Sequence, residues 1–176
     1  MNTPDTGPVA AFLTHIRPSF PSGTRLTWLQ IGLDDTRVVT DHEAGTPVLY
    51  RLAVGTQQMG GRGFKQYPPT PYELEMAIAE VEDELMPLAR QWHGVSTLVL
   101  ADTLAQQVVL MSGEPVGDTG VCSRDAIESL FGQLAAVSQG RPVASSGLPA
   151  ETDFAAYVLI LREFMHHVGF ESLTLR

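Results

Sequence analysis

Three short β-favouring runs follow one another between residues 25 and 53 and are separated by turn residues. The runs are residues 26–32, 37–40 and 47–53. Asp34 and Asp35 form the first predicted turn and residues 42–45 the second, because short polar residues and glycine tolerate tight backbone geometry. Three strands joined by two short turns predict an antiparallel meander.

The residues before the meander are rich in proline, with Pro4, Pro8, Pro18 and Pro21 in close succession. One apolar-rich segment, residues 9–16, lies among them and is predicted to form a small helix or a docked arm. We therefore divide the chain into an N-terminal arm, residues 1–23, and one domain that covers residues 24–176.

The most sharply defined helix begins at Thr70. Thr70-Pro71-Tyr72-Glu73 combines a capping residue, a proline at the first helical position and a glutamate at the third, which together predict a capping box. The apolar positions that follow at helical spacing are Leu74, Ile78, Val81, Leu85, Leu88 and Trp92. The opposite face carries Glu75, Glu80, Glu82, Asp83 and Glu84. We interpret these acids as a solvated helix surface with no catalytic role.

The second half of the chain alternates strands and helices. A buried-type strand over 96–100 precedes a short helix over 103–110, and loops cover 111–121 and 138–149. Ser123 is predicted to cap the next helix, Gly169 to end the last one, and residues 172–175 to form the closing strand. The order βββ, α, β, α, α, α, β predicts an α/β fold, with a mixed sheet and helices on both its faces.

Composition narrows the classes of function. The chain has 176 residues, 44% of them hydrophobic, and 11 basic against 20 acidic residues give a net charge of −9. The acidity argues against nucleic acid as a partner, since such binding depends on basic residues. No apolar run reaches the roughly 18 residues of a membrane span, and the polar start lacks a signal core, so we expect a cytoplasmic protein with no membrane partner. The single cysteine, Cys122, allows no internal disulfide.

Four stretches of the sequence resemble the exopolyphosphatase / guanosine pentaphosphate phosphatase family, in the same order. They are Leu26-Thr-Trp-Leu-Gln-Ile-Gly-Leu-Asp-Asp-Thr-Arg-Val-Val39, Gly55 with Tyr67-Pro-Pro-Thr-Pro-Tyr-Glu-Leu74, Cys122-Ser-Arg-Asp-Ala-Ile-Glu-Ser-Leu130, and Gly147-Leu-Pro-Ala-Glu-Thr-Asp153 with Leu159-Ile-Leu-Arg162 and Val168-Gly-Phe-Glu-Ser-Leu-Thr174. That family belongs to the actin-like ATPase superfamily and has two ribonuclease-H-like subdomains. The resemblance covers residues 24–176 and is to the second subdomain only, so it implies a ribonuclease-H-like domain.

The family's phosphate-binding motifs are degenerate here. Its first signature is Asp-Ile-Gly-Gly-Gly-Ser, and the corresponding positions are Gln30, Ile31, Gly32, Leu33, Asp34 and Asp35. Its second signature, Gly-Gly-Thr, corresponds to Ala101, Asp102 and Thr103. Glycines there would let backbone N–H groups approach an anion. Carboxylates repel it instead, by ~1 kcal/mol for two like charges about 4 Å apart in water.

The resemblance also implies that catalysis needs a first subdomain, and residues 1–23 are too few to form one. We therefore expect an exopolyphosphatase-related protein that is catalytically inactive, with no catalytic residue, and that acts as a binding or regulatory module. One alternative is a phosphohydrolase, cleaving the anhydrides of polyphosphate or a nucleotide, whose site is completed by a second chain. A further alternative is a protein-interaction domain without phosphate chemistry.

A metal site is a separate hypothesis. If the hairpin and the loop after the fourth strand meet as the resemblance implies, Asp34, Asp35 and Asp102 would converge and could hold Mg²⁺ or Ca²⁺, which prefer oxygen ligands. The alternative is that these acids are solvated turn residues, and then no cofactor is expected.

Other candidate groups carry less chemistry. The run Gly60-Gly61-Arg62-Gly63 lacks the lysine–hydroxyl pair of a phosphate loop and is interpreted as a connection. His166 and His167 are adjacent, so on a helix they point about 100° apart and do not readily share a metal.

An open face predicts assembly. The family's second subdomain packs against its partner subdomain, and a lone copy would expose that face. We therefore expect a homodimer or a complex with another protein.

Overall fold

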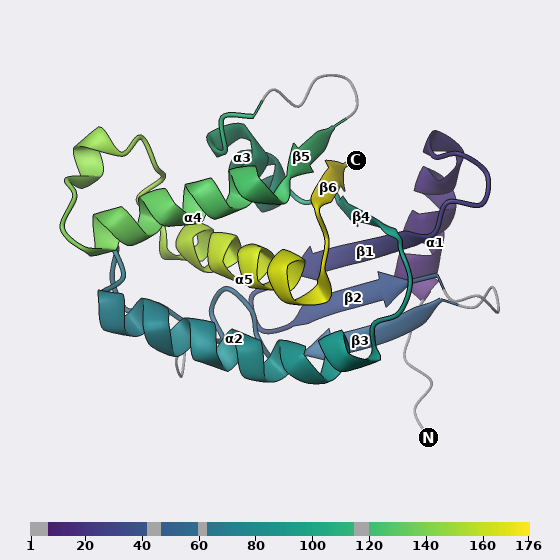
Figure 1. Cartoon of the computed structure of the whole chain (residues 1–176), viewed down its shortest axis with the longest axis horizontal. Helices are drawn as coiled ribbons and strands as arrows, with labels where there is room; N and C mark the ends of the chain where they lie inside the picture. The colour runs from purple at the N-terminus through teal and green to yellow at the C-terminus, as the bar shows by residue number, and fades with distance from the viewer. Residues whose placement is uncertain (1–6, 42–46, 60–62, 115–119) are drawn as a thin grey trace.

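A six-stranded mixed sheet forms the centre of the molecule (Figure 1). The computed structural model describes residues 7–41, 47–59, 63–114 and 120–176. The predicted turn at 42–45, three residues of the glycine run at 60–63 and much of the predicted loop at 111–121 lie outside these ranges. The strands are β1 (Leu26–Ile31), β2 (Thr36–Thr40), β3 (Val48–Leu52), β4 (Thr97–Leu100), β5 (Val121–Ser123) and β6 (Ser172–Leu175).

The strands lie in the order β3-β2-β1-β4-β6-β5. β1 pairs antiparallel with β2, and β2 with β3. β4 pairs parallel with β1 and with β6, whereas β5 runs antiparallel to β6 at the edge. Because β1 and β4 are parallel neighbours, the residues that follow their carboxyl ends, 32–35 and 101–103, lie at the same edge of the sheet.

Five helices accompany the sheet, together with short 3₁₀ turns over Arg17–Ser19 and Val143–Ser145, within the described ranges. The helices are α1 (Gly7–Ile16), α2 (Pro71–Gln91), α3 (Thr103–Met111), α4 (Arg124–Ser138) and α5 (Thr152–Val168). The predicted capping box of α2 is confirmed, because Thr70 and Glu73 bond reciprocally. Ser123 caps α4, and Gly169 ends α5 with a left-handed φ of 88°, both as predicted.

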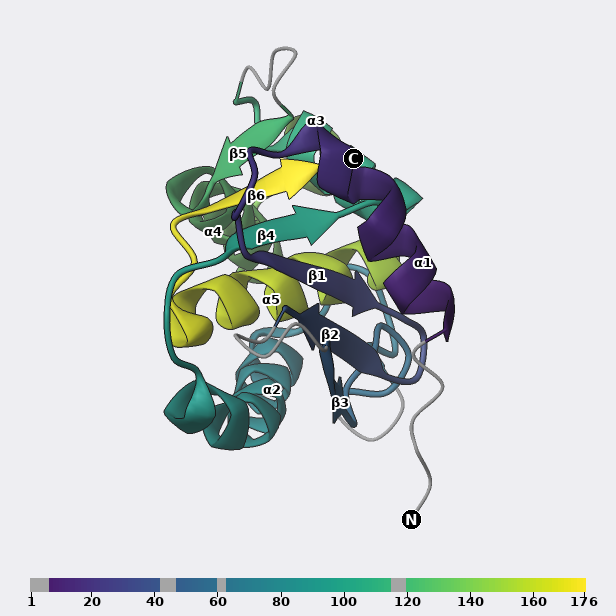
Figure 2. The ribbon, with the colours of Figure 1, turned by 90° about the vertical axis from the view of Figure 1, so that its right-hand side faces the viewer.

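The two faces of the sheet are covered differently. Figure 2 shows α1 on one face, where Ile16 contacts Leu26, Val39 and Val99. The other helices lie on the opposite face, where Leu29 and Ile31 belong to the main core. Alternate residues of β1 therefore serve two cores, as the period of two in a strand dictates. Helices on both faces were predicted, but β5 was not, because a three-residue edge strand leaves no periodic pattern.

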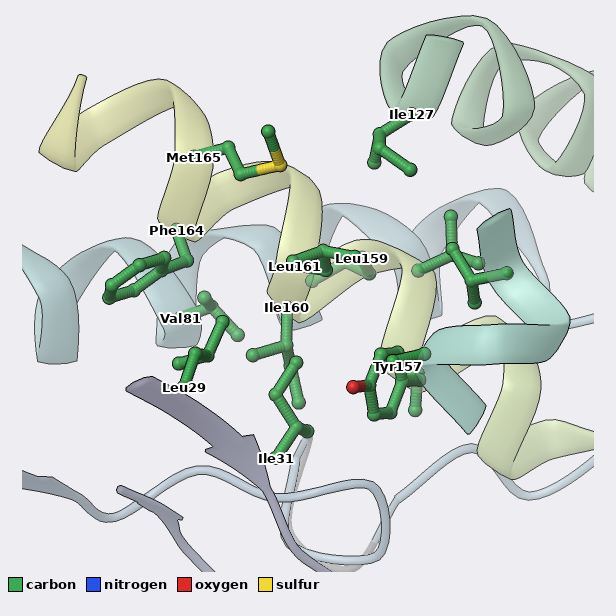
Figure 3. Close-up of a cluster of buried hydrophobic side chains, with 14 of the residues drawn as sticks. Leu29, Ile31, Val81, Ile127, Tyr157, Leu159, Ile160, Leu161, Phe164 and Met165 are labelled. Atoms are coloured by element: carbon green, nitrogen blue, oxygen red, sulfur yellow. The ribbon is translucent and has the colours of Figure 1, made fainter. Parts of the chain in front are cut away.

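Helix α5 is the centre of the main core. Its residues from Phe154 to Leu161 are all buried, and Figure 3 shows Ile160 and Tyr157 above Leu29 and Ile31 of β1. Val81 of α2 and Ile127 of α4 approach α5 from other sides. A helix that is apolar around nearly its whole circumference is stable only when it is enclosed in this way.

Cys122 is part of the same core. Its thiol is buried, and burial raises the pKa to about 11. Because the thiolate is the reactive species, this cysteine is chemically inert at neutral pH.

No helix among the described residues is both long enough and apolar enough to cross a lipid bilayer.

Candidate functional site

The hairpin after β1 and the loop after β4 meet at a hollow of about 250 Å³. Six of the nine motif positions line it: Gln30, Ile31, Gly32, Leu33, Asp102 and Thr103. Thr56 and Leu104 complete the lining. The structure therefore brings the two degenerate phosphate motifs together, whereas Ala101, Asp34 and Asp35 lie outside this hollow.

The hairpin turn is closed by its own hydrogen bond. The backbone N–H of Gly32 donates to the carbonyl oxygen of Asp35 at 2.9 Å. A Cβ added at Gly32 would lie 2.9 Å from that same oxygen, so the turn has no room for a side chain here. The Gly32 N–H is thus already used within the protein and does not face an anion.

A second loop, residues 55–58, holds the hairpin from outside. The backbone N–H groups of Thr56 and Gln57 donate to the carbonyl oxygens of Gly32 at 2.9 Å and Leu33 at 2.8 Å. A Cβ added at Gly55 would lie 2.6 Å from the carbonyl carbon of Leu33, a separation that real atoms do not adopt. We call residues 55–58 the clamp loop. Its close approach fixes the shape of the hairpin tip.

Asp35 turns away from the hollow. Its carboxylate contacts Arg51, and Arg37 Nε lies 3.4 Å from the same oxygen. Arg37 and Arg51 are cross-strand partners on β2 and β3, so their guanidinium groups flank the acid. The two arginines therefore balance the negative charge of Asp35 within the sheet.

Asp102 is occupied by two structural contacts. One carboxylate oxygen caps α3 by accepting a hydrogen bond from Ala105 N at 2.8 Å, and the other accepts one from the Tyr157 hydroxyl at 2.7 Å. Burial, followed by the Asp102 carboxylate, raises the pKa of Tyr157 well above its usual value. Tyr157 therefore stays protonated and keeps donating to Asp102.

Asp34 is exposed and lies beside a different hollow, where the side-chain amide of Gln57 donates a hydrogen bond to the Asp153 carboxylate. Asp34, Asp35 and Asp102 thus have separate surroundings, and the structure does not bring the three carboxylates of the predicted Mg²⁺ or Ca²⁺ site together. Among the described residues, a group of three side chains with the spacing of metal ligands lies elsewhere. It consists of Glu82, Glu163 and His167.

Sequence reasoning missed the residues that support this hollow. Tyr157 belongs to the apolar stripe of α5 and gives no separate signal, although its hydroxyl contacts Asp102. The role of Asp102 itself was readable, since aspartate directly before a helix favours capping. The clamp loop has no local signal beyond Gly55.

The two histidines at the end of α5 have different partners, as predicted from their adjacency. His166 Nδ1 lies 3.3 Å from Glu128, and His167 Nε2 lies 3.2 Å from Glu82. The interpretation of the α2 acids as a solvated surface is wrong for Glu82 and Glu84. Glu82 contacts His167, and Glu84 accepts a hydrogen bond from Ala53 N at 2.9 Å.

Together, the strand order β3-β2-β1-β4-β6-β5 and the helices on both faces of the sheet (Figure 2) define a mixed α/β fold. Solved structures of Ppx/GppA exopolyphosphatases share this fold. The Aquifex aeolicus member of the Ppx/GppA family matches with a TM-score of 0.66 and 15% identity over 92% of this chain and 55% of its own. An exopolyphosphatase from Cytophaga hutchinsonii matches with a TM-score of 0.61 and 12% identity over 88% and 53%.

The chain thus spans about 55% of the length of the structures it matches, as expected for one of two subdomains. The resemblance inferred from the sequence motifs is confirmed at the level of the fold. No protein-family model and no curated protein matches the sequence.

Proposed function

We propose that this chain is an exopolyphosphatase-related module that binds a partner or regulates one, and that it does not hydrolyse phosphoanhydrides by itself. The shared fold supports the relationship to the Ppx/GppA structures. The argument for inactivity comes from the hollow between the hairpin and the α3 loop.

The observation that carries the proposal is the state of Asp102. In the position that corresponds to a phosphate-binding glycine, the chain places a carboxylate that accepts hydrogen bonds from Ala105 N and Tyr157. The donors at the start of α3 and on α5 therefore already hold an anion that belongs to the protein. A phosphate group would have to displace this carboxylate and overcome its charge.

The positions around the hollow also differ from the family motif in their capacity to activate water, since the one carboxylate in its described lining, Asp102, is already held by Ala105 N and Tyr157. Gln30 replaces the acid of the family motif, and an amide cannot accept a proton at neutral pH. Phosphoryl transfer depends on positioned charges around the phosphate, and this edge of the sheet supplies a negative one instead.

A phosphate-release assay tests the proposal. The purified chain, given polyphosphate or nucleoside triphosphates with Mg²⁺, is expected to release no more phosphate than a blank without protein. Asp34→Ala and Asp102→Asn are the matched controls, and both should equal the blank. Turnover by the wild type that either substitution reduces would overturn the proposal.

A second candidate is a phosphohydrolase whose site a second chain completes. The hollow favours this candidate, because it is still formed and Thr103, which carries a hydroxyl group, lines it. This candidate differs in one outcome of the same assay. Phosphate release would appear only when a second protein is added, and Thr103→Ala, at an exposed position, would reduce it without unfolding the chain.

We also propose that the module self-associates or binds another protein through this edge of the sheet. Leu33, at the rim of the hollow, is 53% exposed although it is a large apolar residue. Light scattering at high concentration is expected to give a mass above the 19.1 kDa of one chain. Leu33→Asp should lower that mass. A mass of 19.1 kDa at every concentration would exclude self-association and leave only a different partner.

A further inference from the structure

A second cluster of polar side chains lies between α2 and α5, away from the hollow. Glu163 and His167 are four residues apart and so share one face of α5. Glu82 reaches them from α2. His167 Nε2 lies 3.2 Å from Glu82 Oε1 and 3.3 Å from Glu163 Oε2. The positions lie six to ten residues beyond Tyr157, or about 9–15 Å along the helix axis, so the cluster is independent of the proposed function.

Glu163 is the unusual member of the cluster. Its side chain is 0% exposed, in a class of residue that is almost never fully buried without a partner. Oε1 contacts the guanidinium of Arg162, which lies over the ring of Phe131. Oε2 accepts no hydrogen bond, although it points at His167. A buried carboxylate oxygen without a donor is costly, so its orientation toward the imidazole requires an explanation.

Histidine alone does not satisfy both acids. His167 Nε2 can carry one hydrogen atom, whereas two carboxylate oxygens lie at nearly equal distances from it. Arg162 balances only one of the two carboxylate charges. A divalent cation at the common centre would bind both oxygens and the imidazole lone pair at once.

The spacing of the three ligand atoms fits such an ion. They lie within 4.8 Å of one another. Zinc bonds to nitrogen and oxygen are about 2.0–2.1 Å long, so a tetrahedral site separates its ligand atoms by roughly 3.3 Å. The two distances from His167 agree with this value. Mixed imidazole and carboxylate ligands favour zinc-type ions over Mg²⁺ or Ca²⁺.

We propose that Glu82, Glu163 and His167 form a binding site for a divalent transition metal, with Zn²⁺ as the ion that suits it. The metal binds the lone pair of His167 Nε2, with the single hydrogen of the neutral imidazole on Nδ1, and joins α2 to α5. Glu82 is 43% exposed and His167 22% exposed, so the ion has a path from solvent and a fourth position for water.

Calorimetric titration of the chelator-treated full chain with Zn²⁺ tests the site. The wild type is expected to bind one ion per chain. Glu82→Gln and His167→Gln should each weaken Zn²⁺ binding at least about tenfold. Removal of a residue that only supports a metal ligand weakens binding by about this much, and removal of a ligand itself should weaken it no less. His166→Gln is the matched control, since it removes the neighbouring imidazole outside the cluster, and it should bind as the wild type does.

Co²⁺ supplies a readout that a purely structural ion pair would not give. The wild type and His166→Gln should develop the visible absorption of a tetrahedral cobalt site, and His167→Gln should not. Glu82→Gln changes a half-exposed residue and leaves the fold intact, so the test does not depend on a substitution of the buried Glu163. Absence of binding by the wild type, or equal binding by His167→Gln and the wild type, would overturn the proposal.

Discussion

Replacing Gly55 by alanine is expected to lower the free energy of unfolding by about 3 kcal/mol, the upper end of the usual cost of overpacking. The added Cβ would lie 2.6 Å from the carbonyl carbon of Leu33 and 2.7 Å from that of Asp34, and both atoms are backbone that cannot rotate aside. Either the clamp loop or the hairpin tip must move. Such a movement breaks the hydrogen bonds from Thr56 and Gln57 to the hairpin.

Denaturant unfolding followed by circular dichroism measures this loss. Gly132→Ala is the matched control, because Gly132 is exposed within α4 and a Cβ there meets nothing within 4 Å. Alanine is the better helix former, so this control should raise the stability by up to about 1 kcal/mol. If Gly55→Ala were as stable as the wild type, the clamp loop would not hold the hairpin in the manner described.

Asp102→Ala is expected to destabilise the protein by about 2–4 kcal/mol, from two losses at one residue. The start of α3 loses its cap, at about 1 kcal/mol. The hydroxyl of Tyr157, in a fully buried side chain, loses its acceptor at about 1–3 kcal/mol.

A double-mutant cycle separates the two losses. Adding Tyr157→Phe removes the hydroxyl that Asp102→Ala leaves unpaired, so the double variant should be no less stable than Asp102→Ala alone. Asp102→Asn retains an oxygen that accepts from Ala105 N, and its amide N–H can donate to the phenol oxygen of Tyr157. Its loss of stability should therefore be smaller than that of Asp102→Ala. Additive losses in the cycle would mean that Asp102 and Tyr157 do not depend on each other.

Local chemistry predicted the parts of the fold that adjacent residues decide. The capping box at Thr70 and the glycine that ends α5 at Gly169 need only their own neighbours, and both are confirmed. The short strand β5 escaped prediction because three residues at a sheet edge depend on the partner strand β6 rather than on their own pattern.

The candidate site likewise has parts that the sequence predicted and parts that it did not. The family resemblance implied that the hairpin and the loop after the fourth strand meet, and in the structure Gln30 and Asp102 line one hollow there. It could not show that Asp35 turns toward Arg51, or that Tyr157, 55 positions from Asp102, occupies that carboxylate. These contacts join residues far apart in the chain, and only the packing of α5 against the sheet decides them.

The place of β6 in the sheet has a consequence for how the protein is made. This strand is the sixth of the six described strands in sequence, yet it lies between β4 and β5 and pairs with both. Helix α5, also late in sequence, fills the middle of the core. During synthesis the meander and α2 therefore leave the ribosome with their apolar faces uncovered, and the sheet closes only once residues 172–175 have emerged.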